Sequence, residues 1–417
     1  MTTLAPADPA VLARSLLSAR AVRARAHQML ALAEADAIPE LTVDLARLEI
    51  AADETIATMC NAYPALQIPP HARWRHFSAG GIDRWPLLVR DAAALADPVE
   101  KARAAADLAI VSVLLDAGAG PDWAYADPAS GTRIARSEGL AVASFDAFVA
   151  GLFSADPARP LQADAAALSG LKASRLAEAF QAGPANPLVG VEGRAGLIAR
   201  LGDVVASRPD VFALTDTPRP GGIIDALMAV AENGRLPAER ILETVLDALG
   251  SIWPSRLTLA GVPLGDCWRH PALVTGDASD GLVPFHKLSQ WLSYSMLEPL
   301  GWAGLTVTDL DGLTGLPEYR NGGLFLDTGV IALRNPADAT RPLTVDDPLV
   351  VAWRALTVAL LDRVAELIRT KLSLTAEELP LAAVLEGGTW AAGRRLARRF
   401  RADGGPPLVI VSDGTVF

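Results

Sequence analysis

Side chains that can transfer protons, bind anions or stack on a ring gather in a few short segments of this sequence. These segments are dense in tryptophan, arginine, histidine, aspartate and glycine, and they contain four of the five histidines. If they converge in the fold, they form a pocket of rings, cations and carboxylates; the alternative is a set of ordinary turns, each with its own arginine–aspartate pair. The segments are 71–77 (HARWRHF) with Asp83-Arg84, 116–123 (DAGAGPDW), 136–138 (RSE), 253–256 (WPSR), 265–270 (GDCWRH), 284–291 (PFHKLSQW) and 311–323 (DGLTGLPEYRNGG).

Common catalytic loops do not occur in this sequence. Gly118-Ala-Gly120 lacks the third glycine of a dinucleotide loop, and it ends a predicted helix rather than opening one. There is no GxxxxGK[ST] loop for phosphates and no GxSxG elbow for a nucleophilic serine. A phosphate-cradling loop and a serine hydrolase therefore have no support.

Histidine spacing gives little sign of a metal. His71 and His76 are five residues apart, which places them on different faces of a helix. His270 and His286 would join Asp266 around a metal only through folding, because no recognised ligand spacing links them. We expect no metal and no other cofactor.

Composition, charge and cysteine content argue against several classes of protein. The 417 residues are 51% hydrophobic and carry a formal charge of −11, so the chain can fill a core and is a poor match for duplex nucleic acid. Cys60 and Cys267 form no CxxC pair, which is typical of reduced thiols in the cytoplasm. The first residues lack a signal-peptide pattern, and the apolar runs are too short to span a bilayer. We expect a cytoplasmic protein that binds a small molecule and neither a membrane nor nucleic acid. The oligomeric state stays open.

Residues that typically start or end helices predict the elements that must position the polar segments. An aspartate or leucine followed by proline starts helices at residues 8, 97, 236 and 347, and these run to about 34, 118, 250 and 371. The capping box at 375–378 starts another helix, which Gly387-Gly388 separates from the last one. Strand patterns occur at 257–264, at 324–333 and at 408–417, where Asp413-Gly414 forms a hairpin turn.

These elements predict a mainly α fold with a minor β component. We expect a single large, mostly helical domain over residues 1–417, with two lobes and the site between them as the alternative arrangement. A cluster of five arginines near the end of the last helix complements the helix dipole in solvent, and binding of a phosphate is the alternative. The cluster consists of Arg394, Arg395, Arg398, Arg399 and Arg401.

The polar segments, in this order, resemble a protein family of fungi and bacteria that is linked to uracil catabolism. The resemblance runs from the first helix to Arg334 and is carried by 71–77 with 80–84, 114–123, 265–270, 284–291 and 310–327. It implies a role in the route that opens the pyrimidine ring after ribosylation and releases urea.

A more distant likeness is to the queuosine-salvage family, whose members are N-glycosidases on a nucleoside monophosphate. That family carries a Phe-x-Lys-x-x-Gln segment, which 285–290 resembles, and an Asp-Tyr-Arg segment after a Leu-Thr turn, which 313–320 resembles with Glu318 in place of aspartate. A helix-end aspartate followed by a tryptophan matches Asp116 and Trp123. The family's Val-Pro after the arginine is Asn321-Gly322 here. The likeness implies a helical fold akin to helix-hairpin-helix DNA glycosylases, without DNA binding.

The resemblance implies roles for several residues. Breaking a C1′–N bond places positive charge on the ribose, which a carboxylate stabilises while it deprotonates the attacking water. Glu318 is the candidate, with Lys287 or Arg320 keeping its pKa down. The leaving urea needs a proton, for which His286 and Asp116 are the candidates. The expected catalytic residues are Glu318, Lys287 and His286, and the expected substrate-binding residues are Asp116, Trp123, Tyr319, Arg320, Arg75, His76 and Arg269.

Each of these residues also has an ordinary structural interpretation. Glu318 can serve as an acid at a helix start, Tyr319 as a core ring, and Lys287 as a chain lying over an aromatic patch. The leading hypothesis is a hydrolytic N-glycosidase of uracil catabolism that cleaves a ribosylurea-like compound, with or without a 5′-phosphate, to urea and a ribose derivative. The alternatives are a non-catalytic partner that binds a ligand for the ring-opening enzyme, and a metal-dependent amidohydrolase.

Overall fold

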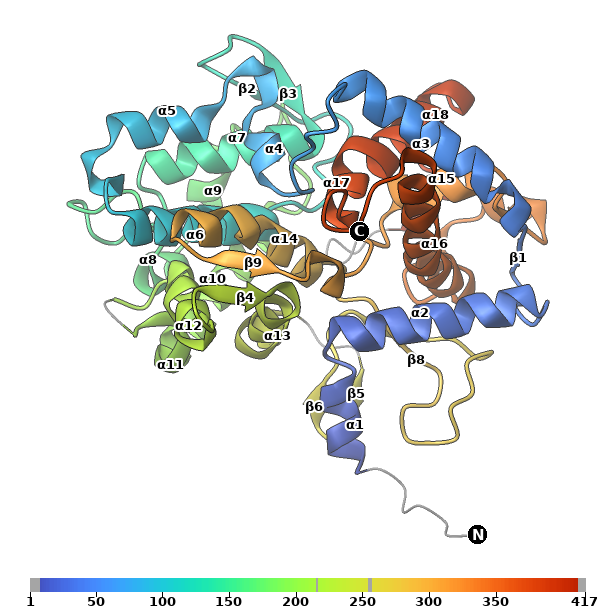
Figure 1. The fold of residues 1–417 in the computed structure, drawn as a ribbon. Coiled ribbons are helices and arrows are strands. Elements are labelled where there is room, and N and C mark those ends of the chain that lie inside the picture. The colour runs from blue at the N-terminus through green and yellow to red at the C-terminus, as the bar shows by residue number, and fades with distance from the viewer. Residues whose placement is uncertain (1–7, 215–216, 254–256, 412–417) are drawn as a thin grey trace. The chain divides into compact units, whose positions relative to one another are not determined.

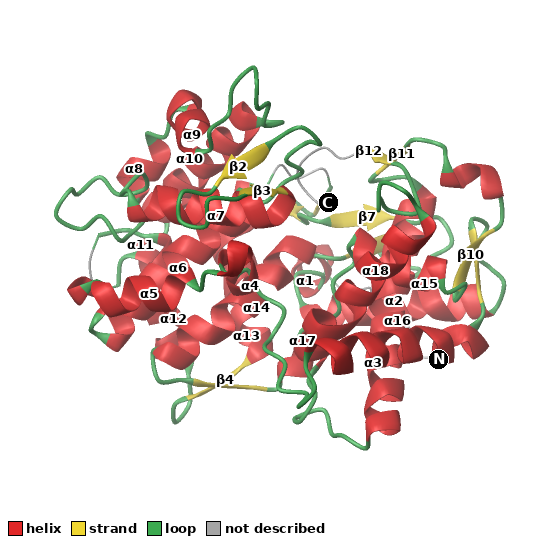
Figure 2. Cartoon of the chain, turned by 90° about the horizontal axis from the view of Figure 1, so that it is seen from above, coloured by secondary structure: helices red, strands yellow, loops and turns green. Residues whose placement is uncertain are grey.

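The computed structural model describes residues 8–214, 217–253 and 257–411, and it forms two compact units. The first unit comprises residues 1–71, 254–290 and 309–417, and the second comprises 72–253 and 291–308. Helices dominate both units in Figure 1, and the second view in Figure 2 shows only short strands between them. Among the described residues every sheet has two strands, which confirms the predicted mainly α fold with a minor β component.

The helices of the first unit come from both ends of the sequence. They are α1 (Pro9–Ser15), α2 (Ala19–Glu34), α3 (Leu48–Ala62), the start of α14 (Lys287–Trp302), α15 (Tyr319–Asp327), α16 (Pro348–Leu372), α17 (Leu381–Ala383) and α18 (Trp390–Phe400). Residues Val384–Thr389 form a π-helical segment between α17 and α18, called the π-turn below. The paired strands are β1 (Leu41–Val43) with β10 (Ile331–Leu333), β5 (Thr258–Leu259) with β6 (Val262–Pro263), β7 (Cys267–Arg269) with β8 (Leu282–Pro284), and β11 (Leu343–Thr344) with β12 (Ile410–Val411). Short 3₁₀ turns lie at Leu45–Arg47, Leu310–Gly312 and Pro336–Ala339.

Helix α16 forms the centre of the first unit. Every residue from Leu349 to Leu361 is buried, as expected for a helix that is covered on all sides. The N-terminal helices α2 and α3 pack against it, so the blue and red ends of the ribbon lie together in this unit (Figure 1). Helices α15 and α18 approach closely, because a Cβ at Gly393 would lie 2.0 Å from the carbonyl oxygen of Arg320.

The second unit is helical as well. Its helices are α4 (Trp74–Phe77), α5 (Arg84–Asp91), α6 (Pro98–Leu114), α7 (Arg136–Val149), α8 (Ala165–Ser169), α9 (Ala173–Ala179), α10 (Val191–Ser207), α11 (Pro209–Phe212), α12 (Ile223–Val230), α13 (Ala238–Leu249) and the remainder of α14. Strand β2 (Ala124–Ala126) pairs with β3 (Arg133–Ala135), and β4 (Arg235–Pro237) pairs with β9 (Thr306–Thr308). The 3₁₀ turns are Ala79–Gly81, Ala93–Leu95, Pro220–Gly222 and Gly250–Ile252.

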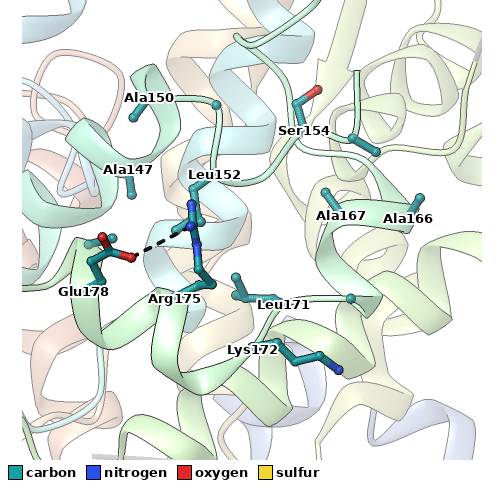
Figure 3. A pocket seen from close by; sticks show the side chains of 14 residues that line it. Ala147, Ala150, Leu152, Ser154, Ala166, Ala167, Leu171, Lys172, Arg175 and Glu178 are labelled. Carbon is teal, nitrogen blue, oxygen red and sulfur yellow. Dashed lines mark ion pairs between the residues drawn. The ribbon is translucent and has the colours of Figure 1, made fainter. Parts of the chain in front are cut away.

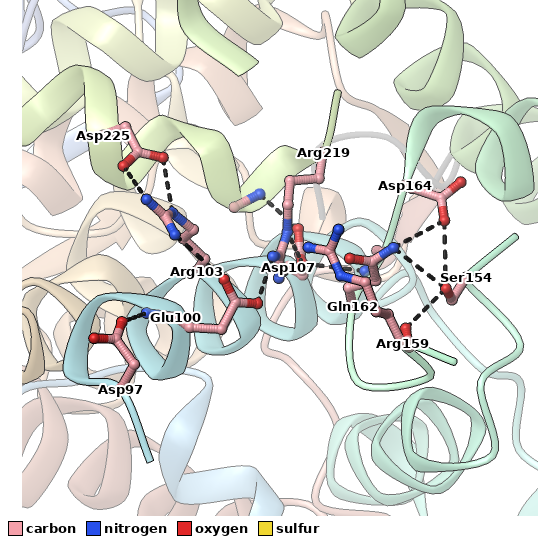
Figure 4. Close-up of polar contacts among 12 residues, drawn as sticks. Asp97, Glu100, Arg103, Asp107, Ser154, Arg159, Gln162, Asp164, Arg219 and Asp225 are labelled. Carbon is pink, nitrogen blue, oxygen red and sulfur yellow. Dashed lines mark hydrogen bonds and ion pairs between the residues drawn. The ribbon is translucent and has the colours of Figure 1, made fainter. Parts of the chain in front are cut away.

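A buried ion pair joins α6 to the turn before α12 (Figure 4). The carboxylate of Asp107 accepts hydrogen bonds from Arg219 at 2.6 and 2.8 Å, and from the backbone amides of Ala163 and Gly221. Arg219 also donates to Glu100 at 2.6 Å. With these partners the buried carboxylate is fully hydrogen-bonded, so the polar core of this unit is stable only while its charges stay matched.

Helix starts agree with the sequence better than helix ends do. Helices α6 and α16 begin at the proline that follows a capping aspartate, and α13 begins directly after Pro237, but α6 ends at Leu114 rather than near 118. The helix predicted from residue 8 is two helices, because the hydroxyl of Ser18 caps the start of α2.

Predictions around glycine and short apolar runs were less accurate. The hairpin at 257–264 is confirmed by β5 and β6, but the strand predicted at 324–333 is wrong up to Asp327, where α15 ends. The capping box of Thr375 and Glu378 forms, but only a turn follows it. Gly387-Gly388 do not separate two helices as predicted, because both residues lie inside the π-turn. Asp413-Gly414 lie outside the described residues.

No helix within the described ranges is long and apolar enough to cross a membrane.

The ion pair on α6 gives a stability prediction. Asp107→Asn leaves the buried Arg219 without the fully buried one of its two anionic partners, and we expect a loss of about 3–5 kcal/mol in the free energy of unfolding. Denaturant unfolding followed by circular dichroism measures the loss. The control is Asp91→Asn, which removes an exposed ion pair with Arg90 and leaves the midpoint unchanged. Equal midpoints for the two variants would contradict the assignment.

Candidate functional site

The site of the first unit is built around Asp266, which lies just before β7. Its carboxylate binds the guanidinium of Arg354 through two contacts of 2.8 Å, and it accepts the indole N–H of Trp268 at 2.7 Å. The backbone amide of Lys287, at the start of α14, donates to the same carboxylate at 3.0 Å. Burial alone would raise the pKa of Asp266, but Arg354 and these donors lower it to about 2. Asp266 is therefore a fixed anion that positions the first turn of α14.

Arg354 connects this anion to the segment that carries Glu318. Its guanidinium carbon lies 4.1 Å from the ring centre of Phe285, and its Nε donates to the carbonyl of Pro317 at 3.4 Å. Pro317 immediately precedes Glu318, so the two segments that resemble the queuosine-salvage family are held by one buried arginine. That Phe285 and Glu318 belong to one constellation was predicted from the sequence; the arginine between them was not.

Glu318 is the N-cap of α15. Its two carboxylate oxygens accept the backbone amides of Arg320 at 2.7 Å and of Asn321 at 2.5 Å. A carboxylate has about four acceptor positions, so these bonds leave Glu318 capacity to accept further donors. The structural interpretation of Glu318 as an acid at a helix start is therefore correct, and it is compatible with a second role.

Burial dominates the electrostatics of Glu318. The side chain is 8% exposed, and burial raises its pKa above the ordinary value. The two backbone amides oppose this rise, as do the charges of Lys287 and His71. The expectation that Lys287 lowers this pKa is confirmed, but the net pKa is raised because desolvation of the carboxylate outweighs the attraction. Arg320 instead donates to the carbonyl of Gly404 at 2.8 Å.

One histidine of this unit, His71, was not among the residues that the sequence assigned to the site. Nδ1 of His71 contacts the carboxylate of Glu386 at 2.6 Å, and the His71 ring centre lies 6.1 Å from that of Trp390. Glu386 belongs to the π-turn, a type of irregularity that is frequent at functional sites. The only sequence signal for this pair was the histidine-rich segment 71–77, since Glu386 lies in an otherwise plain stretch.

The remaining hydrogen bonds lock the turn before α15. The side chain of Gln290 accepts the backbone amide of Thr314 at 3.0 Å and also donates to the Thr314 hydroxyl. Asn321 accepts the hydroxyl of Thr389 at 2.8 Å, which links α15 to the end of the π-turn. Gln290 and Asn321 thus hold the backbone in place rather than reach outward.

His286 and Arg269, which were predicted to act on substrate, have structural partners. Nε2 of His286 contacts the carbonyl of Leu16 at 2.9 Å, and burial lowers the pKa of this histidine. Its backbone has a φ of +48°, at the bend that leads into α14. Arg269 is exposed and donates to the carbonyl of Asp280 at 2.5 Å. Neither contact involves Glu318.

A second polar cluster lies in the second unit. The fully buried Arg73 donates to Ser112 at 2.8 Å and to Ser137 at 3.0 Å, and it contacts Asp116 at 3.1 Å. Ser137 donates to Asp116 at 2.6 Å and contacts Nδ1 of His76 at 3.1 Å. Burial lowers the pKa of Arg73, against the attraction of Asp116. Asp116 and His76 are thus brought together, as the convergence of segments predicted.

Three other predicted binding residues contact partners within the fold. Trp123 is buried, with its indole N–H donating to the carbonyl of Phe180 at 3.0 Å, so it is a core ring of the second unit and not a pocket wall. Arg75 pairs with Glu298. Tyr319 is half-buried, and the guanidinium carbon of Arg320 lies 4.9 Å from its ring centre.

The arginines at the end of α18 pair with local acids. Arg401 binds both carboxylate oxygens of Asp327 at 2.7 Å, and Arg395 pairs with Glu54. Arg394 lies over the ring of Trp390, 5.2 Å from its centre. These contacts agree with the interpretation of the cluster as a helix end facing solvent.

A search of the described residues for metal ligands and one cavity of the second unit concern other parts of the fold than the predicted site. Across the described ranges, no three or more histidine, cysteine, aspartate or glutamate side chains are placed to hold a metal ion. His270 contacts Glu40 at 3.3 Å instead of joining Asp266. A cavity of about 580 Å³ in the second unit is bordered by Arg175 and Glu178, which form an ion pair at 3.9 Å (Figure 3). It contains none of the predicted site residues. Residues 254–256 of the WPSR segment lie outside the described part.

Comparison with known proteins places the chain in a family. A family model described as a protein of unknown function, DUF1688, matches residues 15–417. The chain belongs to this family. It is 37% identical over 409 residues to Protein urg3 of Schizosaccharomyces pombe, covering 96% of this chain and 98% of the relative. It is 39% identical over 379 residues to Uracil catabolism protein 4 of Lachancea kluyveri, covering 84% and 85%. The family resemblance seen in the sequence is confirmed.

The low pKa of Asp266 gives a pH prediction. Because the pKa falls from 3.8 to about 2 on folding, the stability that this carboxylate contributes is present above about pH 4 and lost as the pH falls toward 2. The shift corresponds to about 2 kcal/mol. The difference in unfolding free energy between wild type and Asp266→Asn should therefore shrink by about that amount between pH 6 and pH 2. Urea unfolding across this range measures it, and a difference independent of pH would contradict the ion pair.

Proposed function

We propose that this protein is a hydrolytic N-glycosidase of uracil catabolism. Its substrate is a ribosylurea-like compound, with or without a 5′-phosphate, and its products are urea and a ribose derivative. The role in uracil catabolism is supported by the relative named Uracil catabolism protein 4. The reaction type is supported by one observation above all, the buried carboxylate of Glu318 with Lys287 and His71 near enough for their charges to act on it.

The chemistry of the bond explains why such a carboxylate is useful. As the C1′–N bond lengthens, positive charge develops on C1′ and the ring oxygen of the ribose, and a nearby anion stabilises that charge. The same carboxylate can accept a proton from the attacking water. A pKa raised by burial makes Glu318 a stronger base than an exposed glutamate, which brings it nearer to the working pH.

Two backbone amides give Glu318 a fixed orientation. Because the amides of Arg320 and Asn321 bind the carboxylate, its oxygens do not rotate away from the start of α15. Fixed geometry of this kind lowers the entropic cost of reaching the transition state. The residues Gln290 and Asn321, which lock the neighbouring turn, support the same orientation.

Lys287 has the role of keeping this base ionised. It begins α14, and its backbone is held by Asp266, while its charge lowers the pKa of Glu318 against the effect of burial. Glu318 must lose its proton before it can accept one from water. Lys287 therefore sets the lower limit of the pH range in which the enzyme works.

The proposal is tested directly by the release of urea. Purified wild type, treated with a chelator, is expected to release urea from ribosylurea or its 5′-phosphate. Glu318→Gln keeps the shape and one acceptor of the side chain but removes the base, so turnover should fall by about two to four orders of magnitude with substrate affinity largely kept.

The control for that variant is Asp347→Asn. Asp347 caps α16 in the same unit, so the substitution removes a cap charge without touching the site. It should leave turnover unchanged. Urea release by Glu318→Gln at the wild-type rate would overturn the role of Glu318 and favour a non-catalytic partner of the ring-opening enzyme. Activity that is lost to the chelator, together with stoichiometric bound metal, would favour an amidohydrolase.

The role of Lys287 predicts a shift in the pH profile. Lys287→Met removes a charge that lowers the pKa of Glu318, so that pKa rises and the acidic limb of kcat/KM moves to higher pH. Lys371→Met is the control, since Lys371 pairs with Glu49 and Asp53 on the surface of the same unit. Its acidic limb should stay in place. An unmoved limb in Lys287→Met would show that this lysine does not act on the base.

A further inference from the structure

In the pair of His71 and Glu386, hydrogen bonds hold both the backbone and the ring of the histidine. His71 is 5% exposed, and its backbone amide donates to the carbonyl of Ala382 at 3.0 Å. Its Nδ1 contacts Glu386 at 2.6 Å, so a carboxylate fixes the orientation of the ring. The other ring nitrogen, Nε2, is then the one whose proton can be transferred.

The π-turn places Glu386 in a tightly packed part of the first unit. A Cβ at Gly388 would lie 2.6 Å from the side chain of Thr55, and one at Gly387 would lie 2.9 Å from Ile68. The two glycines therefore let the π-turn lie against α3 and the segment that leads to His71. This π-turn brings the carboxylate of Glu386 onto the buried His71, and π-turns of this kind are frequent at functional sites.

The π-turn that carries Glu386 is joined to the start of α15, because the hydroxyl of Thr389 donates to Asn321 at 2.8 Å and the amide of Asn321 binds Glu318. The charge of His71 also acts on Glu318 and lowers the pKa of that carboxyl group. The cation of Lys287 acts there as well, whereas His286 is held by the carbonyl of Leu16. Of these two histidines, the charge of His71 acts on Glu318, whereas the sequence suggested His286.

We propose that His71 is the general acid of the reaction, that Glu386 is its positioning residue, and that the group protonated is the nitrogen of a poor leaving group such as urea. This inference rests on the proposed N-glycosidase function. Urea leaves poorly as an anion, so an enzyme that hydrolyses its riboside needs a proton donor as well as a base.

The step balances without any other reagent. Water attacks C1′ and gives one proton to Glu318, while the C1′–N bond breaks and its electron pair stays on the urea nitrogen. That nitrogen takes the proton from Nε2 of His71. The products are ribose, carrying the new hydroxyl, and neutral urea. Transfer of the proton from Glu318 back to His71 through solvent restores the starting state.

The test compares two leaving groups on the same sugar. Ribosylurea needs protonation of its leaving nitrogen, whereas p-nitrophenyl riboside releases a stable anion and needs none. Both are used with or without the 5′-phosphate, in whichever form the wild type hydrolyses. His71→Gln should lower kcat/KM for ribosylurea by about 10²–10⁴-fold and change that for the nitrophenyl compound by less than about tenfold. Glu386→Gln should show the same selectivity with a smaller loss.

The control is His27→Gln. His27 contacts Asp362 at 2.9 Å, so it forms another histidine–carboxylate pair in the same unit, and its loss should leave both substrates unaffected. Equal losses on the two substrates in His71→Gln and Glu386→Gln would overturn the assignment of the acid while leaving the glycosidase in place. Hydrolysis of neither substrate by the wild type would instead overturn the proposed function. If His71→Gln does not fold, the selectivity of Glu386→Gln decides.

Discussion

Asp266 accepts hydrogen bonds from three parts of the first unit, and the candidate site depends on these contacts. Arg354 neutralises it from the central helix α16, Trp268 donates from β7, and the amide of Lys287 donates from the start of α14. Because Arg354 also reaches the carbonyl of Pro317, the same charge pair fixes the turn that precedes α15. A buried pair of this kind is costly to break, since either partner left alone is an uncompensated charge in the interior. The start of α14 with Lys287 and the turn that leads to Glu318 are therefore both positioned by this one buried ion pair.

The parts of the fold that the sequence predicted are those with local causes. An aspartate before a proline satisfies helix amides within four residues, so the starts of α6 and α16 were correct. The hairpin around Gly261 follows from a turn of similar size. The motif with Glu318 was also found, because its residues are close in the chain. Where longer contacts decide, as in the helix α15 that replaced a predicted strand, alternation of apolar residues was misleading.

The parts that could not be predicted join distant residues. His71 and Glu386 are 315 positions apart, and nothing near either one specifies the other. Gly387-Gly388 carry the usual signal of a break, but contact with Thr55 and Ile68 makes small residues necessary inside a continuous helical path. Trp123 is a different case: the sequence assigned this ring of a polar segment to a pocket, and in the structure it is buried with its indole N–H donating to the carbonyl of Phe180. Residue type alone did not separate these cases.

The contact between Glu386 and His71 also depends on the number of residues in the π-turn. Each residue of an α-helix advances the chain by about 100° around the axis, and a π-turn accommodates its extra residue by widening instead. Loss of one residue between Ala383 and Trp390 would restore ordinary helical spacing and rotate Glu386 away from His71 without altering either side chain. Among members of the family, a gap of one position in this stretch is therefore as informative as a substitution. In a relative with the shorter turn, the glutamate would still align with Glu386, but its carboxylate would no longer contact the histidine.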